Sequence, residues 1–89
     1  MIIVSYDIAD DKMRTRFAKM LKGYGAIRLQ LSVYEVQNTK RIVDNIMAKI
    51  EAYAKHFTND DSVVVFEVDT DKLIKYGNAI HRDQPLVIF

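Results

Sequence analysis

The chain opens with a run of β-branched and aromatic residues, Ile2 to Tyr6, that ends at an aspartate, Asp7. This composition is typical of a central strand covered on both faces, where an unpaired charge costs on the order of several kcal/mol. Asp7 therefore either marks the solvated end of the strand or has a functional role there. The run is too short to span a membrane or to act as a signal peptide.

The 89 residues include no cysteine, which excludes a disulfide framework and a thiolate zinc site. This length predicts one small domain over residues 1–89, and we expect it in the reducing cytoplasm without membrane contact. The two histidines lack metal-ligand spacing and no serine has an adjacent histidine. Zinc chemistry and nucleophilic catalysis by serine are therefore not expected.

The first predicted helix begins at Asp10 or Asp11, either of which can cap the free amides of a first turn, and ends near Gly23 or Gly25. Its apolar residues recur at the spacing of one helix face: Met13, Phe17, Met20, Leu21 and Tyr24. Asp10 and Asp11 could also add ligands to a metal held by Asp7, but capping accounts for both residues.

The second predicted helix runs from about Thr39 to Phe57 and has the clearest periodicity in the chain. Its apolar face comprises Ile42, Val43, Ile46, Met47, Ile50, Tyr53, Ala54 and Phe57. His56 falls in the last turn, where a cationic imidazole would meet the negative end of the helix dipole. We prefer this structural interpretation of His56 to a catalytic one.

Three more segments have strand composition. Arg28 to Val36 fits either one long bulged strand or two short strands with a tight reversal at Ser32. Val63 to Val68 is almost fully apolar, and Leu86 to Phe89 follows Pro85, which suits entry into an edge strand.

The order of these elements predicts an α+β fold: a ferredoxin-like βαββαβ domain with an additional C-terminal strand. Both helices then cover one face of the sheet, and the apolar strands leave the other face in need of cover. A second copy of the chain is the simplest cover for so small a domain, so we expect a two-fold homodimer. The C-terminal segment, residues 78–89, is expected to pack on the dimer partner.

The charge is uneven although the net charge is only +1. No acidic residue lies between Lys12 and Arg28, a stretch that also holds Arg14, Arg16 and Lys19. Arginine presents a fixed fork to phosphate oxygens, so these five residues are candidates for binding a nucleic-acid backbone with little sequence preference. The alternative is a solvated helix face on which Arg14 and Arg16 pair with Asp10 or Asp11.

Several of these segments together resemble one known family. The matching parts are VSYDI around Tyr6 and Asp7, the pair Arg14 and Arg16, Tyr24-Gly25, and RLQLSVYE from Arg28 to Glu35. Over nearly the whole chain the sequence resembles the CRISPR-associated protein 2 family, the small partner of the CRISPR spacer integrase. The tail from Lys72, with Tyr-Gly-Asn-Ala-Ile-His-Arg, is similar to members that accompany single-effector type V systems.

The resemblance implies a two-fold dimer of ferredoxin-like subunits whose tail strand packs on the neighbouring subunit. It implies that Asp7 binds Mg²⁺, or Mn²⁺ in its place, across the dimer axis, and that Asp7 and Tyr6 are catalytic. It also implies an interface that includes Tyr34 and the tail residues Leu86, Val87, Ile88 and Phe89.

Three functions are compatible with these residues. The first is a CRISPR adaptation protein that dimerises, binds the backbone of duplex DNA and bridges the spacer integrase, CRISPR-associated protein 1. The second is a metal-dependent endonuclease that uses Asp7, including a stand-alone ribonuclease acting on RNA; both functions can coexist. The third is a ferredoxin-like regulatory domain that binds a small metabolite, for which the sequence offers no ligand motif.

Overall fold

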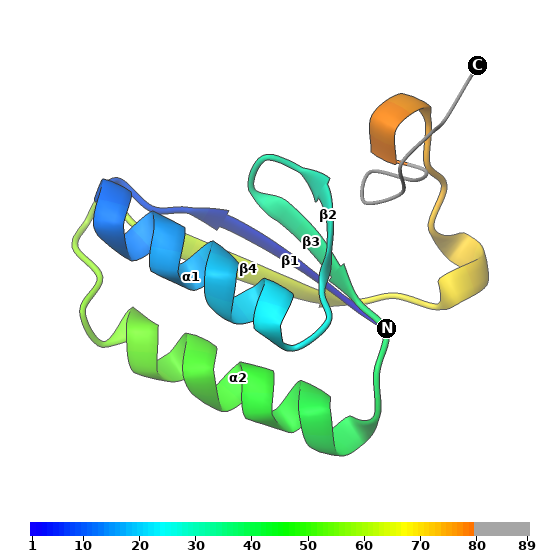
Figure 1. The fold of residues 1–89 in the computed structure, drawn as a ribbon, viewed down its shortest axis with the longest axis horizontal. Coiled ribbons are helices and arrows are strands. Elements are labelled where there is room, and N and C mark those ends of the chain that lie inside the picture. Colours follow the sequence, from blue (N-terminus) through cyan, green and yellow to red (C-terminus); the bar gives the residue numbers. More distant parts are fainter. Residues whose placement is uncertain (80–89) are drawn as a thin grey trace.

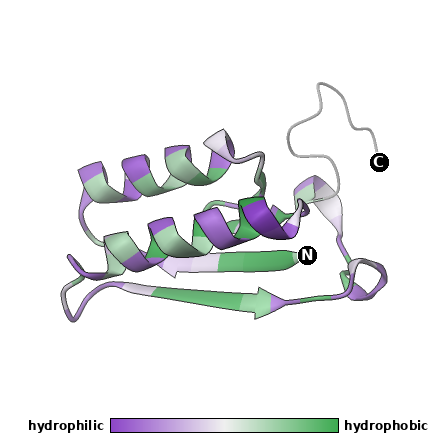
Figure 2. Cartoon of the chain, turned by 90° about the horizontal axis from the view of Figure 1, so that it is seen from below, coloured by the Kyte–Doolittle hydropathy of each residue, from purple (hydrophilic) through white to green (hydrophobic). Residues whose placement is uncertain are grey.

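The computed structural model describes residues 1–79. Its elements are β1 (Ile2–Asp7), α1 (Asp11–Gly23), β2 (Ile27–Gln30), β3 (Val33–Val36), α2 (Lys40–Ala54) and β4 (Ser62–Glu67), followed by two short 3₁₀ turns, Thr70–Lys72 and Gly77–Ala79. The strands form one antiparallel sheet in the order β2-β3-β1-β4, and both helices cover the same face of it (Figures 1 and 2). This is the predicted ferredoxin-like α+β arrangement.

β1 is the central strand, as its apolar composition predicts. It pairs with β3 from Ile2 to Ser5 and with β4 over its full length, from Ile2 opposite Glu67 to Asp7 opposite Ser62. Because side chains alternate along a strand, Ile2, Val4 and Tyr6 point into the core beneath the helices. Ile3, Ser5 and Asp7 therefore lie on the opposite face of the sheet, which we call the open face.

α1 begins at Asp11 and ends at Gly23, within the bounds predicted from its capping residues. The Asp10 Oδ2 accepts a hydrogen bond from the Met13 amide at 2.8 Å, and the helix stops at Gly23. The chain then turns through Gly25, whose φ of 86° belongs to the left-handed region that favours glycine. The predicted apolar face is confirmed: Phe17 and Leu21 are buried, and Met13, Met20 and Tyr24 pack against them.

α2 is capped by Thr39 but ends at Ala54, earlier than the predicted Phe57. The His56 amide donates to the Tyr53 carbonyl and the Phe57 amide to the Ala54 carbonyl, so the chain tightens into a turn after the helix. Most of the predicted apolar face packs in the core, led by the buried Ile46 and Ile50. Met47 and Ala54 do not belong to that face, because both are exposed.

The segment from Arg28 to Val36 forms two strands, which decides between the two predicted arrangements. Leu31 and Ser32 make the reversal between β2 and β3, and the Ser32 carbonyl accepts a hydrogen bond from the Tyr6 amide at 3.0 Å. The pairing of β2 with β3 also shifts register between Arg28 and Gln30, so a bulge is present within the hairpin.

The open face of the sheet carries the one buried charged side chain among residues 1–79, Glu35, which is 6% exposed. Its carboxylate forms an ion pair with Lys75 from the segment that follows β4. Because a buried carboxylate needs a partner, this contact holds the segment after β4 against the sheet. Ile3 and Leu29 are also buried, but they do not belong to the core cluster that lies beneath the helices.

Two expectations about the C-terminus are not tested by this fold. The predicted tail strand, residues 86–89, and all but the first two residues of the predicted segment 78–89 lie outside the described residues. Within residues 1–79 neither helix is long and apolar enough to cross a lipid bilayer.

Candidate functional site

Asp7 lies exposed at the end of β1, on the open face, opposite Ser62 of β4. Within residues 1–79 no hydrogen bond or ion pair is formed by its carboxylate. The charge is therefore free to meet a cation or a partner from outside the subunit. This position agrees with both interpretations of Asp7, a solvated strand end and a functional carboxylate.

Asp61 positions the loop that follows Asp7, a role that sequence reasoning missed. Its Oδ1 accepts a hydrogen bond from the Ala9 amide at 2.9 Å, and its Oδ2 accepts one from the Thr58 amide at 2.9 Å. The amide of Ala9, followed by that of Thr58, lowers the pKa of the Asp61 carboxyl. The acidic turn before β4 is the sequence signal for such a cap, but its partner lies far away in the chain.

The neighbouring carboxylates of α1 are already used within the subunit. Asp10 caps the helix, and Asp11 forms an ion pair with Arg14, so neither is turned to a metal beside Asp7. Residues 1–79 contain no cluster of three side chains suited to holding a metal ion. Mg²⁺ keeps several water ligands and is commonly held by one or two carboxylates, so Asp7 can supply one ligand and the others would come from water, a phosphate or a second copy of the chain.

Tyr6 lies on the other side of the sheet from Asp7. Its ring packs edge-on to Phe17 at 4.8 Å and stacks with Tyr34 at 6.1 Å between ring centroids. Its hydroxyl makes a long hydrogen bond of 3.5 Å to the Leu31 carbonyl. Burial, followed by the neighbouring Tyr34, raises the pKa of the Tyr6 phenol to about 12, so the hydroxyl stays protonated at neutral pH. The structure does not bring Tyr6 and Asp7 into one site.

The position of Tyr34 corrects its predicted place at an interface. Tyr34 is only 1% exposed and lies in the subunit core with Tyr6 and Phe17, because its strand position points it beneath the helices. A side chain that is already enclosed has no surface to offer a partner. The other predicted interface residues, Leu86, Val87, Ile88 and Phe89, lie outside the described residues.

Arg14 is largely occupied by its own subunit. One terminal nitrogen of its guanidinium donates to the Ile8 carbonyl at 3.0 Å and to the Ala9 carbonyl at 3.4 Å, and the other pairs with Asp11. These contacts brace the loop between β1 and α1. The alternative interpretation, in which Arg14 pairs with a nearby aspartate, is therefore confirmed for Asp11.

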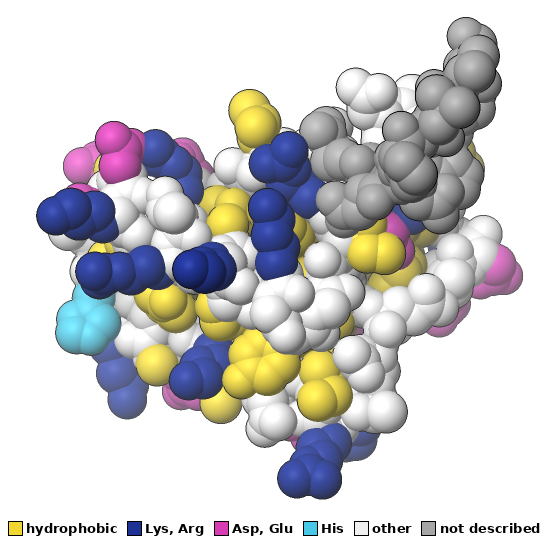
Figure 3. Space-filling model, in the orientation of Figure 1, with side chains coloured by type: hydrophobic (Ala, Val, Ile, Leu, Met, Phe, Trp, Pro, Cys, Tyr) yellow, Lys and Arg dark blue, Asp and Glu magenta, His cyan; other side chains and the backbone are white. Residues whose placement is uncertain are grey.

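The other predicted phosphate-binding residues of α1 share one exposed face. Lys12, Arg16 and Lys19 recur at i, i+4 and i+7, and none has an ion pair within residues 1–79. Figure 3 shows Lys and Arg side chains gathered over α1. Arg28 is set apart from them, because it is half-buried on β2 opposite Tyr34.

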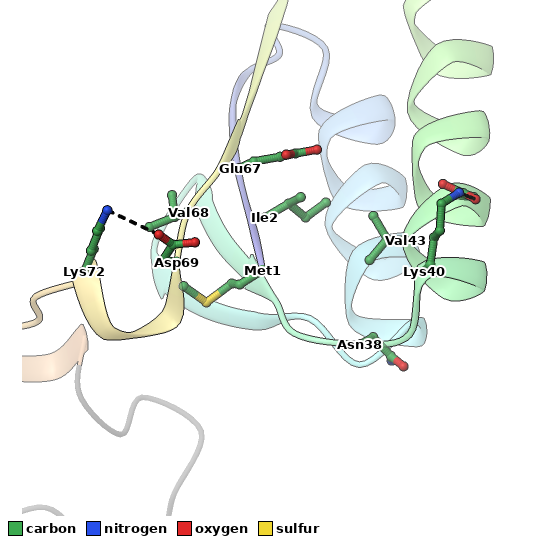
Figure 4. A pocket seen from close by; sticks show the side chains of 10 residues that line it. Met1, Ile2, Asn38, Lys40, Val43, Glu67, Val68, Asp69 and Lys72 are labelled. Atoms are coloured by element: carbon green, nitrogen blue, oxygen red, sulfur yellow. Dashed lines mark hydrogen bonds and ion pairs between the residues drawn. The ribbon is translucent and has the colours of Figure 1, made fainter.

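A hollow of about 700 Å³ lies at the opposite end of β1 from Asp7, around Met1 and the start of α2 (Figure 4). Its lysines pair with its aspartates: Lys40 with Asp44 at 2.8 Å and Lys72 with Asp69 at 3.3 Å. These pairs neutralise most of the charge that lines the hollow. Asp7 does not face this hollow.

Residues 1–75 match the family model described as CRISPR associated protein Cas2. The chain belongs to the Cas2 family. The "CRISPR-associated endoribonuclease Cas2 3" of Chloroflexus aurantiacus is 58% identical over 86 residues, which cover 93% of this chain and 89% of that protein. The "CRISPR-associated endoribonuclease Cas2 2" of Pyrobaculum aerophilum is 29% identical, with 85% of each chain covered.

Solved structures of similar proteins share the Cas2 fold. A "crystal structure of cas2" superposes with a TM-score of 0.64 at 26% identity and covers 99% of this chain and 93% of the other.

The "CRISPR-associated endoribonuclease Cas2" of Thermus thermophilus is 41% identical over 51 residues. That match spans only about half of each protein, 57% of this chain and 53% of the relative.

The raised pKa of Tyr6 predicts a specific loss of stability in alkali. The unfolded chain releases this proton near the ordinary value of 10 and the folded chain at about 12, so the contribution of Tyr6 is complete below pH 10 and is lost between pH 10 and 12. Urea unfolding across this range should show a steeper fall for the wild type than for Tyr6→Phe. Parallel curves for the two proteins would contradict the buried position of the phenol.

Proposed function

We propose that this Cas2-family protein acts in CRISPR adaptation as a two-fold dimer that binds the backbone of duplex DNA and bridges the spacer integrase. The observation that carries the proposal is the row of cations on α1, Lys12, Arg16 and Lys19, which have no ion-pair partner within residues 1–79. Family membership supplies the CRISPR context.

Backbone phosphate is the ligand that best suits this row of cations. Arginine and lysine on one helix face can each displace counterions from phosphates along a strand, and this term is independent of sequence. The nearby carboxylates do not compete for them, because Asp10 caps the helix and Asp11 pairs with Arg14. The same chemistry accepts RNA, whose backbone carries the same phosphates.

The proposed dimer uses the open face of the sheet. Ile27, Val64 and Phe66 are 44%, 49% and 48% exposed there, which is high for strand residues of this size. A second copy of the chain would cover them and bring two Asp7 carboxylates toward one axis. The helix layer, with its cations, would then face outward from both subunits.

The second candidate activity is metal-dependent cleavage of nucleic acid, for which the exposed carboxylate of Asp7 is the candidate metal ligand. The Chloroflexus and Pyrobaculum relatives are named endoribonucleases. In the proposed dimer, the two Asp7 carboxylates would hold Mg²⁺ or Mn²⁺ together with water ligands. Such an ion, when bound, would polarise a phosphodiester and lower the pKa of a bound water. Tyr6 takes no part in this proposal, since it lies across the sheet from Asp7.

Duplex binding should depend on Arg16 and Lys19 and be sensitive to salt. Each lost phosphate contact lowers the slope of log affinity against log salt by roughly one, so the Arg16→Gln, Lys19→Gln double variant should lower it by roughly two. Fluorescence anisotropy with a mixed-sequence duplex measures the slope. Arg14→Gln is the matched comparison: it should reduce thermal stability, because the Ile8 and Ala9 carbonyls lose their donor, with a smaller effect on the slope. If the slope of log affinity against log salt is unchanged in the double variant, the proposal is wrong.

The Asp7→Asn variant should lose Mg²⁺-stimulated cleavage of nucleic acid while the dimer remains intact. Asp10→Asn is the control, because asparagine also caps a helix and the change removes a neighbouring carboxylate. We expect Asp10→Asn to retain cleavage at the wild-type rate. Cleavage by highly purified Asp7→Asn protein at the wild-type rate would show that the activity does not use Asp7.

A further inference from the structure

A groove crosses from the first half of α1 to the C-terminal end of α2. One hollow of about 300 Å³ is lined by Arg16 of α1, Tyr53 of α2 and His56 from the turn after α2. A second hollow of about 250 Å³ continues along α2 and is lined by Lys49, Ala52 and the same Tyr53 and His56. The two hollows share Tyr53 and His56 and therefore adjoin each other, and we call them together the interhelix groove.

The spacing of polar residues along the interhelix groove is regular on both helices. Arg16 belongs to the row that recurs at i, i+4 and i+7 on α1, and Lys49, Tyr53 and His56 recur at the same spacing along α2 and the turn after it. The Tyr53 ring packs edge-on against the buried Phe17 at 5.4 Å, so the floor of the groove is fixed by the core. Figure 3 shows basic side chains spread over the face that carries the two helices.

The interhelix groove has a surplus of positive charge. Asp10 is the acidic residue in its lining, and its carboxylate already accepts the Met13 amide as a helix cap. Arg16, Lys49 and His56 form no side-chain hydrogen bond or ion pair within the described part of the chain. Arg16 and Lys49 are cations without internal partners and remain available to an anionic ligand, and the His56 ring can donate a hydrogen bond to it.

We propose that Lys49 and His56 extend the phosphate-binding surface of α1 onto α2, so that the interhelix groove holds the sugar-phosphate backbone of a duplex nucleic acid. This inference rests on the proposed function and adds a binding site to it. Each hollow is small and open compared with the enclosed sites that hold small molecules, which favours an extended polymer as the ligand. Arg16 is shared between the α1 row and the groove, so one strand of backbone can contact both.

The test measures salt-dependent binding of a mixed-sequence DNA duplex to Lys49→Gln, His56→Gln and the double variant. We expect the Lys49→Gln change to lower the slope of log affinity against log salt by roughly one, and the double variant, which also loses the His56 ring donor, to bind more weakly than Lys49→Gln. Lys72→Gln is the control, because it removes the same charge from outside the groove, where Lys72 pairs with Asp69. Its slope should equal that of the wild type.

The outcomes separate this inference from the proposed function. A wild-type slope in the Lys49→Gln, His56→Gln double variant, alongside a lowered slope in Arg16→Gln, overturns the α2 extension and leaves α1 as the binding surface. An equal reduction in Lys72→Gln overturns it too, because the effect then reflects net charge rather than the groove. If the wild-type protein binds no duplex at any salt concentration, the proposed function itself fails and this inference fails with it.

Discussion

The pairing of β1 on both of its edges is the constraint on which the rest of the structure depends. β3 and β4 fix the register of β1 from either side, so a shift of the strand by one residue would break both sets of backbone hydrogen bonds. The alternation along β1 then places Tyr6 in the core and Asp7 on the open face. Adjacent residues in the chain thus have separate structural roles, and only the second is available for chemistry.

The two faces of the sheet divide the proposed functions between them. The helix layer carries cations without internal partners, whereas the open face carries exposed apolar side chains and Asp7. A dimer formed through the open face would leave the helix layer free to bind nucleic acid. Asp10, Asp11 and Asp61 are bonded within the subunit, and none of them forms an ion pair with Lys12, Arg16 or Lys19.

Local patterns in the sequence predicted most of the fold and less of the candidate site. The helices, their caps and the central strand follow from periodicity and from polar residues at helix starts, both of which are short-range signals. The site depends on contacts between distant segments: Asp61 holds the amide of Ala9, and the core encloses Tyr34. The hydrogen bonds from Arg14 to the Ile8 and Ala9 carbonyls could not be predicted either, because a charge pattern does not reveal bonds to the backbone.

The most direct test of this account is the footprint of a duplex on the protein, measured by the chemical-shift changes of backbone amides when a mixed-sequence DNA duplex is added to the isotope-labelled protein. The account predicts that the largest changes fall on α1 around Arg16 and on the C-terminal end of α2 around Tyr53. It predicts little change along β4 at Val64 and Phe66, which the dimer would cover. Changes concentrated on β4, with α1 unaffected, would contradict it.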